Sequence, residues 1–204
     1  MGKVIVGATV SLDGYVSGPG GAGMRHLFAW FEGGDVEVPS GNPGAPFMLT
    51  ESDARYMRAL NDGIGAYVIG RRMFDGVDGW GGTHPFHKPV VVVTHRVPEE
   101  WVAAHPGASV TFVTDGLVAA LDQARALAGD LDVVVTPGSL TSQCLELGLL
   151  DEVSLDVVPV MLGGGVPFVQ RLAAAPILLD GPTLVLPGKR VMHLRYTVRR
   201  PGAT

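Results

Sequence analysis

Short runs of apolar residues alternate with amphipathic segments along most of the chain. Five of these runs are rich in β-branched residues and are bounded by Gly, Pro, Asp or Asn, which is typical of strands covered on both faces. They span residues 3–10, 66–69, 90–93, 110–113 and 133–135. The pattern therefore predicts five buried strands in the first two thirds of the chain.

Helices are predicted between these strands. Thr50, followed three residues later by Asp53, resembles a capping box at the start of a helix. Apolar residues then recur at helical spacing between Asp115 and Gly129. The predicted helices cover residues 51–62, 115–128 and 138–147, and a further short helix begins at 70–72.

Strands that alternate with helices are typical of an α/β domain with a mainly parallel sheet. The end of the chain differs, because residues 153–160, 177–186 and 190–198 are strand-like and no helix is predicted between the last two. We expect these three stretches to form an antiparallel C-terminal edge. The predicted architecture is a three-layer α/β fold with a central, mainly parallel sheet and helices on both faces.

One domain is expected over residues 1–204, with an irregular insertion at about 17–48. This insertion is rich in Gly and Pro, and long irregular loops in compact domains are usually functional or disordered. The aromatic residues Phe28, Trp30 and Phe31 favour an ordered loop that packs over a cleft and partly closes it.

Composition excludes several classes of protein. Apolar residues make up 47% of the 204 positions and charged residues 17%, which excludes a disordered chain. No apolar run is long enough to span a membrane. The formal net charge of −5 argues against nucleic acid as the main partner. The single cysteine, Cys144, agrees with a reducing cytosol, so we expect a cytoplasmic protein that acts on a small molecule.

Two segments have the design of a phosphate site at the start of a helix. Gly70-Arg71-Arg72 follows a predicted strand, so backbone N–H groups and two guanidinium groups can face an anion. Residues 137–141, Pro-Gly-Ser-Leu-Thr, follow another strand, and the Ser139 and Thr141 hydroxyls are possible extra donors. Together they could hold the two phosphates of one dinucleotide.

Thr94-His95-Arg96 lies at the end of the valine-rich strand 90–93. Ligands of open α/β sheets bind beyond the carboxyl ends of the strands. A hydroxyl, an imidazole and a guanidinium at this place suit a phosphate monoester such as the 2′-phosphate of NADP, and an ordinary polar loop is an equally good interpretation.

Ser11-Leu12-Asp13-Gly14-Tyr15 ends the first strand. Asp13 is the best candidate for a proton donor or for an orienting hydrogen-bond partner, with a bound water as the equal alternative. Gly14 is expected to take a positive φ, and a simple Asx-turn explains the Asp-Gly pair as well. No metal site is predicted, because His84 and His87 have no cluster of cysteines or carboxylates beside them.

The order of these motifs resembles the dihydrofolate-reductase-like fold. The carrying segments are Ser-Leu-Asp-Gly-Tyr (11–15), Gly-Arg-Arg-Met-Phe (70–74), Pro-Val-Val-Val-Val-Thr (89–94), Gly-Leu-Leu-Asp-Glu (148–152) and Pro-Val-Met-Leu-Gly-Gly-Gly (159–165). The block 132–165 is more similar still to the reductase domain of the bifunctional riboflavin-biosynthesis deaminase/reductase and to its standalone relatives. Segment 17–48 is not covered by the resemblance.

The resemblance implies an NADPH-dependent oxidoreductase and a homodimer. By position, the implied contacts with the cofactor phosphates and ribose are Gly70, Arg71, Arg72, Met73, Thr94, His95, Arg96, Gly138, Ser139, Leu140 and Thr141. Ala8, Thr9, Asp13, Gly14 and Tyr15 are implied to lie near the nicotinamide and the substrate. The substrate is a small pyrimidine-like or pteridine-like heterocycle, or a carbonyl compound.

Two positions depart from the family pattern. Thr136 stands where the riboflavin enzyme has an acidic residue that serves the substrate, and Pro137-Gly138 stands where dihydrofolate reductases have Gly-Gly. The first departure argues against the ribosylaminopyrimidine as the substrate. Two alternatives therefore stay open, a dinucleotide- or metabolite-binding protein without turnover and a reductase that uses a flavin or deazaflavin in the same cleft.

Overall fold

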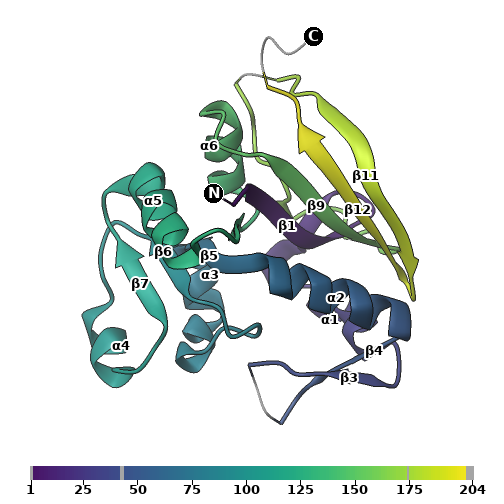
Figure 1. The fold of residues 1–204 in the computed structure, drawn as a ribbon, viewed down its shortest axis with the longest axis horizontal. Helices are drawn as coiled ribbons and strands as arrows, with labels where there is room; N and C mark the ends of the chain where they lie inside the picture. The colour runs from purple at the N-terminus through teal and green to yellow at the C-terminus, as the bar shows by residue number, and fades with distance from the viewer. Residues whose placement is uncertain (1, 42–43, 174, 201–204) are drawn as a thin grey trace.

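The computed structural model describes residues 2–41, 44–173 and 175–200. Its centre is an eight-stranded sheet (Figure 1). The strands lie in the order β11 (Leu179–Gly188), β12 (Val191–Val198), β9 (Glu152–Val158), β1 (Val4–Ser11), β8 (Asp132–Val135), β5 (Ile64–Gly70), β6 (Val90–Val93) and β7 (Val110–Val113). Every apolar run that was predicted to be a strand is a strand of this sheet.

Most neighbouring strands are parallel. The parallel pairs run from β9 through β1, β8, β5 and β6 to β7, whereas β12 is antiparallel to both β9 and β11. The mainly parallel sheet with an antiparallel C-terminal edge is thus confirmed. The placement of 153–160 in the antiparallel part is wrong, because β9 is parallel to β1. The chain reaches β9 through helix α6 (Ser139–Glu146), and a helical crossover makes the next strand parallel.

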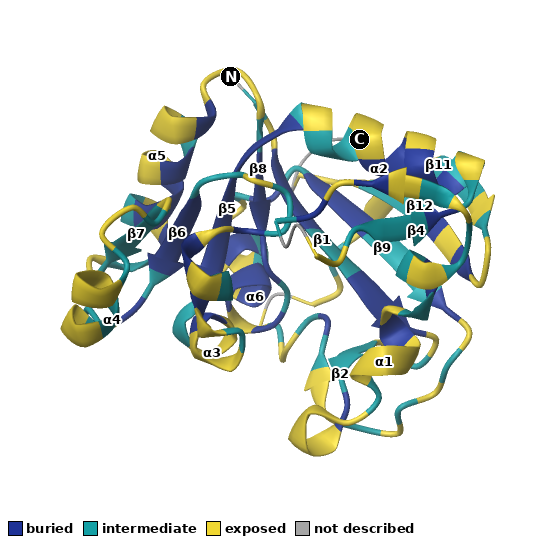
Figure 2. Ribbon diagram, turned by 90° about the horizontal axis from the view of Figure 1, so that it is seen from below, coloured by how far each residue is buried: buried dark blue, intermediate teal, exposed yellow. Residues whose placement is uncertain are grey.

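Helices cover both faces of the sheet. On one face, α5 (Gly116–Ala128) and α6 pack onto the valines of β1, β5 and β8. On the other face, α2 (Glu51–Gly63) buries Ala54 and Met57 against Val158 and Val191. The central strands β1, β8, β5 and β6 are the most deeply buried elements (Figure 2). This arrangement confirms the predicted three-layer α/β fold.

The remaining helices are short. They are α1 (Met24–Leu27), α3 (Arg71–Gly76) and α4 (Glu99–Ala104), together with the 3₁₀ turns η1 (Pro19–Gly21), η2 (Ala29–Glu32) and η3 (Asp78–Gly82). Of the helices that the structure describes, none is long and apolar enough to cross a membrane.

Helix α2 begins at the predicted cap. The Thr50 hydroxyl accepts the Asp53 N–H at 3.2 Å, as in a capping box. The Asp53 carboxylate does not return to the Thr50 amide. It accepts the Thr50 hydroxyl at 2.6 Å and is fully buried. The cap therefore places a carboxylate in the core beside the C-terminal strands.

The described part of segment 17–48 holds several short regular elements, so it is less irregular than expected. It contains η1, α1, η2 and a hairpin of β3 (Val36–Val38) with β4 (Phe47–Leu49). Residues 42–43 lie outside the described residues. Trp30 is 1% exposed and packs with Leu27 in the core that α2 covers, whereas Phe28 lies at the surface. Trp30 and Leu27 therefore belong to the core.

His84 is expected to make folding sensitive to mild acid. Its ring centre lies 4.1 Å from that of Tyr67 with the two rings tilted, and its Nδ1 accepts the Phe86 N–H. Burial lowers the pKa of His84 from 6.5 to about 3. Below pH 6.5 the unfolded chain binds a proton that the folded chain does not, so stability falls as the pH falls. The loss is about 1.4 kcal/mol per pH unit, or roughly 2 kcal/mol between about pH 7 and pH 5.

Urea unfolding at the two pH values measures this slope. A His84→Phe variant should lose about 2 kcal/mol less on acidification than the native chain. His26→Gln, which changes an exposed histidine, should leave the slope unchanged. An unaltered slope in His84→Phe would contradict the assignment.

Candidate functional site

Four parallel strands bring the predicted site segments to one edge of the sheet. Residues 12–15 follow β1, 71–73 follow β5, 94–96 follow β6 and 138–141 come just after β8. Since β1, β8, β5 and β6 are parallel neighbours, these segments lie side by side beyond their carboxyl ends. This edge is referred to below as the carboxyl edge.

Arg71 joins helix α3 to the loop 94–96. Its Nη1 donates to the Arg96 carbonyl at 2.8 Å and to the Thr94 hydroxyl at 3.4 Å, and its Nε pairs with Asp75 at 2.6 Å. The Thr94 hydroxyl also donates to the Arg96 carbonyl, at 2.9 Å. Arg71 thus fixes the loop that presents His95 and Arg96 to solvent.

Three basic side chains remain exposed at this place, those of Arg72, His95 and Arg96. Within the described part of the chain, neither Arg72 nor Arg96 uses its side chain in a hydrogen bond or ion pair. Met73, beside them on α3, is also exposed. The corner between α3 and the 94–96 loop is therefore a cationic surface that can take an anion.

Helix α6 begins at Gly138, which has a φ of +97°. No side chain caps this helix start, so the first N–H groups, at residues 139–141, are available to a ligand. The Ser139 side chain is exposed. The buried Thr141 hydroxyl donates to the Thr136 carbonyl at 3.1 Å, so it is not the extra donor that the sequence suggested. Leu140 likewise buries its side chain in the core.

The starts of α3 and α6 are close neighbours. A Cβ on Gly70 would lie 3.8 Å from Cδ1 of Leu140. Both helices therefore direct their positive ends toward the same part of the carboxyl edge. Two helix starts and three exposed basic groups thus lie together at a place that can take an anion, and this candidate site is called the anion-binding surface below.

The Asp13 carboxylate binds the loop that follows β9. Its carboxylate accepts the Ser11 hydroxyl at 2.6 Å, the Leu162 N–H at 3.0 Å and the Gly163 N–H at 2.7 Å. The Ser11 bond and then the Leu162 amide lower the pKa of Asp13 to about 2. At neutral pH it has no proton to give. Of the two roles considered from the sequence, the geometry favours the orienting one.

The sequence did not assign the segment 159–170 to the site. Phe168 donates its N–H to the Gly14 carbonyl and accepts the Gly138 N–H, each at 2.9 Å, and so joins two of the predicted segments. Strand β10 (Val166–Pro167) pairs with β2 (Tyr15–Ser17). Gly165 has a φ of +115° and an added Cβ would overlap the Ser17 carbonyl. The run Gly163-Gly164-Gly165 was the signal in the sequence that could have pointed to this segment.

Gly14 has the expected positive φ, +87°.

Ala8 and Thr9 occupy the second half of β1 and point to opposite faces of the sheet. The Thr9 hydroxyl accepts the indole N–H of the buried Trp30 at 3.2 Å. Trp30 also lines a cavity of about 200 Å³ at the carboxyl end of β9, together with His26, Ala29, Pro159, Val160 and Arg190. This cavity lies on the β9 side of β1, whereas the anion-binding surface lies on the other side.

A larger groove, of about 580 Å³, lies away from the carboxyl edge between α2 and the β11–β12 hairpin. Among the described residues, no three His, Cys, Asp or Glu side chains gather in a way that could hold a metal ion. The predicted site residues meet at the carboxyl edge and not in this groove.

Residues 2–180 match the family model of the RibD C-terminal domain. No curated protein matches the chain in sequence. Among solved structures, the chain is similar to a protein of Shewanella sp. PV-4 that is described as a riboflavin biosynthesis protein. The two are 22% identical with a TM-score of 0.67, and the match covers 97% of this chain and 99% of that one.

Two further structures share the fold. A pyrimidine reductase-like protein of Corynebacterium diphtheriae is 15% identical with a TM-score of 0.58, over 98% of this chain and 92% of that one. RibD of Acinetobacter baumannii is 17% identical with a TM-score of 0.59, over 98% of this chain and 58% of that one. The chain thus spans little more than half of that longer protein.

Proposed function

The chain belongs to the RibD C-terminal domain family, and from this membership and the carboxyl edge we propose that it is an NADPH-dependent reductase. It would transfer a hydride from the nicotinamide to a small heterocyclic or carbonyl acceptor. The observation that carries the proposal is the meeting of two helix starts with the Arg71-anchored loop 94–96 at one sheet edge. Without that meeting, the segments could not bind one dinucleotide.

Different parts of the anion-binding surface would bind different phosphates of NADPH. The N–H groups at the starts of α3 and α6 would hold the two bridging phosphates, with Gly70 and Gly138 allowing close approach and Met73 beside them. Arg72, His95 and Arg96 would hold the 2′-phosphate, because a guanidinium can pair with a phosphate through two hydrogen bonds. Arg71 and Thr94 would fix the loop on which this contact depends.

The nicotinamide half would reach β1, beside Ala8, Thr9, Gly14 and Tyr15. The bound cofactor supplies the hydride, and the protein's task is to bind and orient both partners. Asp13 would hold the 159–165 loop against the end of β1 through the Leu162 and Gly163 amides. The Trp30 cavity would receive the acceptor on the other side of β1. Thr136, buried and with its carbonyl taken by Thr141, offers no acid to a ribosylaminopyrimidine.

Calorimetric titration with NADPH and then with NADH tests the proposal. We expect micromolar binding of NADPH and much weaker binding of NADH, since only NADPH carries the 2′-phosphate. NADPH oxidation is then followed with a panel of pteridine, pyrimidine, quinone and aldehyde acceptors. Failure to bind either nucleotide, or tight binding of a flavin instead, would overturn the choice of cofactor.

We also infer a homodimer. Val185 on the edge strand β11 and Met192 on its neighbour β12 are exposed apolar residues, and exposed apolar surface is where a second copy of the chain can associate. Sedimentation velocity should give twice the mass of one chain. A monomer at micromolar concentration would contradict the inference.

A further inference from the structure

The groove between α2 and the β11–β12 hairpin has a volume of about 580 Å³ and lies away from the carboxyl edge. It is called the hairpin groove below. Sites for small molecules usually measure about 300–1,000 Å³. The hairpin groove is therefore large enough for a metabolite-sized ligand, and the function proposed above gives it no role.

Apolar side chains from both elements line the hairpin groove. Ala59 and Leu60 come from α2, whereas Leu184 and Leu186 come from β11. Because alternate residues of a strand share a face, Leu184 and Leu186 both point toward α2. All three leucines are only half-buried. An apolar ligand that covered them would remove this apolar surface from water, which is favourable.

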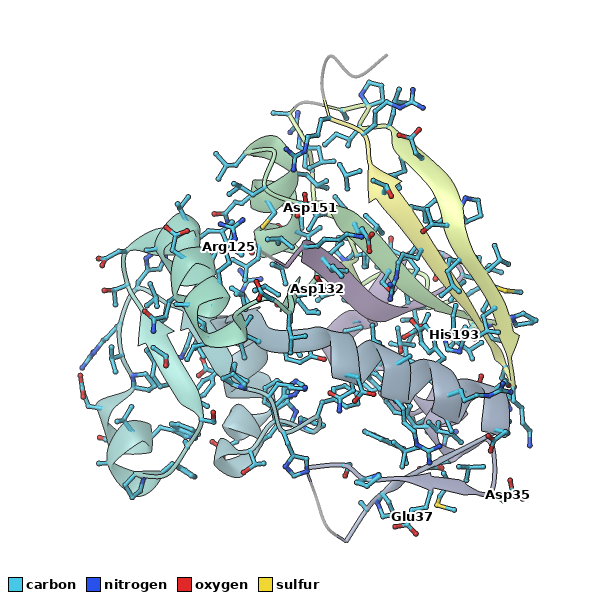
Figure 3. The ribbon with its side chains drawn as sticks, in the orientation of Figure 1. Asp35, Glu37, Arg125, Asp132, Asp151 and His193 are labelled. Atoms are coloured by element: carbon cyan, nitrogen blue, oxygen red, sulfur yellow. The ribbon has the colours of Figure 1, made fainter. Side chains whose placement is uncertain are left out.

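Tyr56 lines the groove and also contacts a buried group of side chains, the His193 cluster, which comprises Asp53, Asp156 and His193. Figure 3 shows His193 between the C-terminal strands and α2. The His193 ring lies between the two carboxylates, with Nδ1 2.6 Å from Asp156 and Nε2 3.2 Å from Asp53. Tyr56 donates its hydroxyl to Asp156 at 2.9 Å and stacks on His193 at 3.8 Å. The Tyr56 hydroxyl is thus already used.

Arg195 of β12 is the polar side chain of the groove that lacks a partner. It lines the groove as the register partner of Leu184, and its side chain is 28% exposed. Its Nε is buried without a hydrogen bond, and within the described residues its guanidinium donates to no acceptor. A guanidinium can donate five hydrogen bonds, and leaving them unmade in a half-buried place is costly. Arg195 therefore has donors to offer to a ligand.

The charges around Arg195 favour an anion. The carboxylate of Glu152 lies 3.9 Å from Nε of Arg195, which is beyond hydrogen-bond distance, and it already accepts from the Lys3 ammonium at 2.5 Å. Two cations thus flank one carboxylate. Arg55 at the rim is exposed and lies 4.0 Å from Glu51, a pair too weak and solvated to change this balance. The groove carries more positive than negative charge.

We propose that the hairpin groove is a second ligand site of this protein and that it binds a small amphiphilic carboxylate. The carboxylate of the ligand pairs with the Arg195 guanidinium, which can bind it through two hydrogen bonds. The apolar body of the ligand covers Leu60, Leu184 and Leu186. The inference is independent of the proposed function, because these residues lie away from the carboxyl edge.

The competing occupant is a second copy of the chain, and the direction of the side chains argues against it. Val185 and Met192 alternate with Leu184 and His193 along their strands, so they point to the opposite face of the sheet. A dimer formed through Val185 and Met192 would leave the hairpin groove open.

Calorimetric titration with octanoate tests the proposal without any acceptor or nucleotide. One octanoate should bind per chain with a Kd below about 1 mM. Acetate, which lacks the apolar body, should bind about 100-fold or more weakly. Octanol and octylamine, which lack the carboxylate, should give no saturable binding. NADPH should leave the octanoate affinity unchanged, because its proposed site is elsewhere.

Two variants locate the site. Arg195→Gln should weaken octanoate by about 10–100-fold, since it removes the charge that pairs with the carboxylate. Ala59→Glu serves if Arg195→Gln folds poorly, because it changes an exposed residue of the groove and repels the ligand; it should abolish binding. Arg58→Gln is the matched control, an exposed arginine of the same helix that does not line the groove. It should leave the affinity unchanged.

Three results would overturn the proposal. One is the absence of saturable octanoate binding up to about 10 mM. Another is an affinity for octanol equal to that for octanoate, or an affinity for octanoate unchanged in both groove variants. The third is a dimer that octanoate dissociates in sedimentation velocity, which would assign the groove to a second copy of the chain.

Discussion

An Asp53→Ala variant is expected to unfold with about 3–5 kcal/mol less free energy than the native chain. The carboxylate is fully buried and accepts from the Thr50 hydroxyl, the Lys189 amide and the His193 ring. Without it, the buried His193 imidazole loses one of its two partners, at a place that solvent does not reach. Urea unfolding followed by tryptophan fluorescence measures the loss.

The control is an exposed carboxylate. Asp122→Ala removes a surface pair with Arg125 on α5, at 3.4 Å, and should change stability by less than about 0.5 kcal/mol. Asp53→Asn should fall between the two, because the amide keeps the shape and one acceptor but removes the charge. A loss in Asp53→Ala as small as that in Asp122→Ala would show that the cluster is not held as the hydrogen bonds indicate.

The strands and long helices could be predicted because burial imposes a local pattern. The runs 90–93 and 110–113 are β6 and β7, and the helix predicted to end before Gly129 does so. In each case the apolar period is 2 or 3.6 residues, or the run is wholly apolar, so neighbouring residues alone carry the information. The capping pair Thr50 and Asp53 located the start of α2 for the same reason.

The direction of β9 and the role of 159–170 could not be predicted in this way. Asp13 and the Leu162 amide that it binds are 149 residues apart, and their contact exists only when β1 and β9 are neighbours. The glycines 163–165 signalled an unusual backbone but not its partner. Contacts of this kind depend on the order of strands in the sheet, which periodicity does not encode.

The His193 cluster was hidden for a related reason. Asp53 had been explained by the helix cap, and Asp156 and His193 interrupt strand-like runs as single polar residues. Only the register of β1, β9 and β12 places Thr9, Asp156 and His193 in one row. A polar residue at an inward strand position was the available signal, since such a residue needs a buried partner.

Replacing Arg96 with alanine is expected to weaken NADPH binding by about 10–100-fold while NADH binding changes little. The side chain is exposed beside Arg72 and makes no hydrogen bond within the described residues, so its removal costs the fold little. Its proposed ligand, the 2′-phosphate, is absent from NADH. The effect therefore falls on one nucleotide only.

Arg71→Ala should also weaken NADPH binding more than NADH binding, but for a different reason. Arg71 holds the Arg96 carbonyl and the Thr94 hydroxyl, so its loss frees the loop that carries the 2′-phosphate contact. Arg55→Ala on α2 makes the same change of charge away from the carboxyl edge and should affect neither nucleotide. Calorimetric titration of the three variants with both nucleotides decides the question. Equal losses of NADPH and NADH in Arg96→Ala would remove the 2′-phosphate from this loop, because a general loss of positive charge weakens both nucleotides alike.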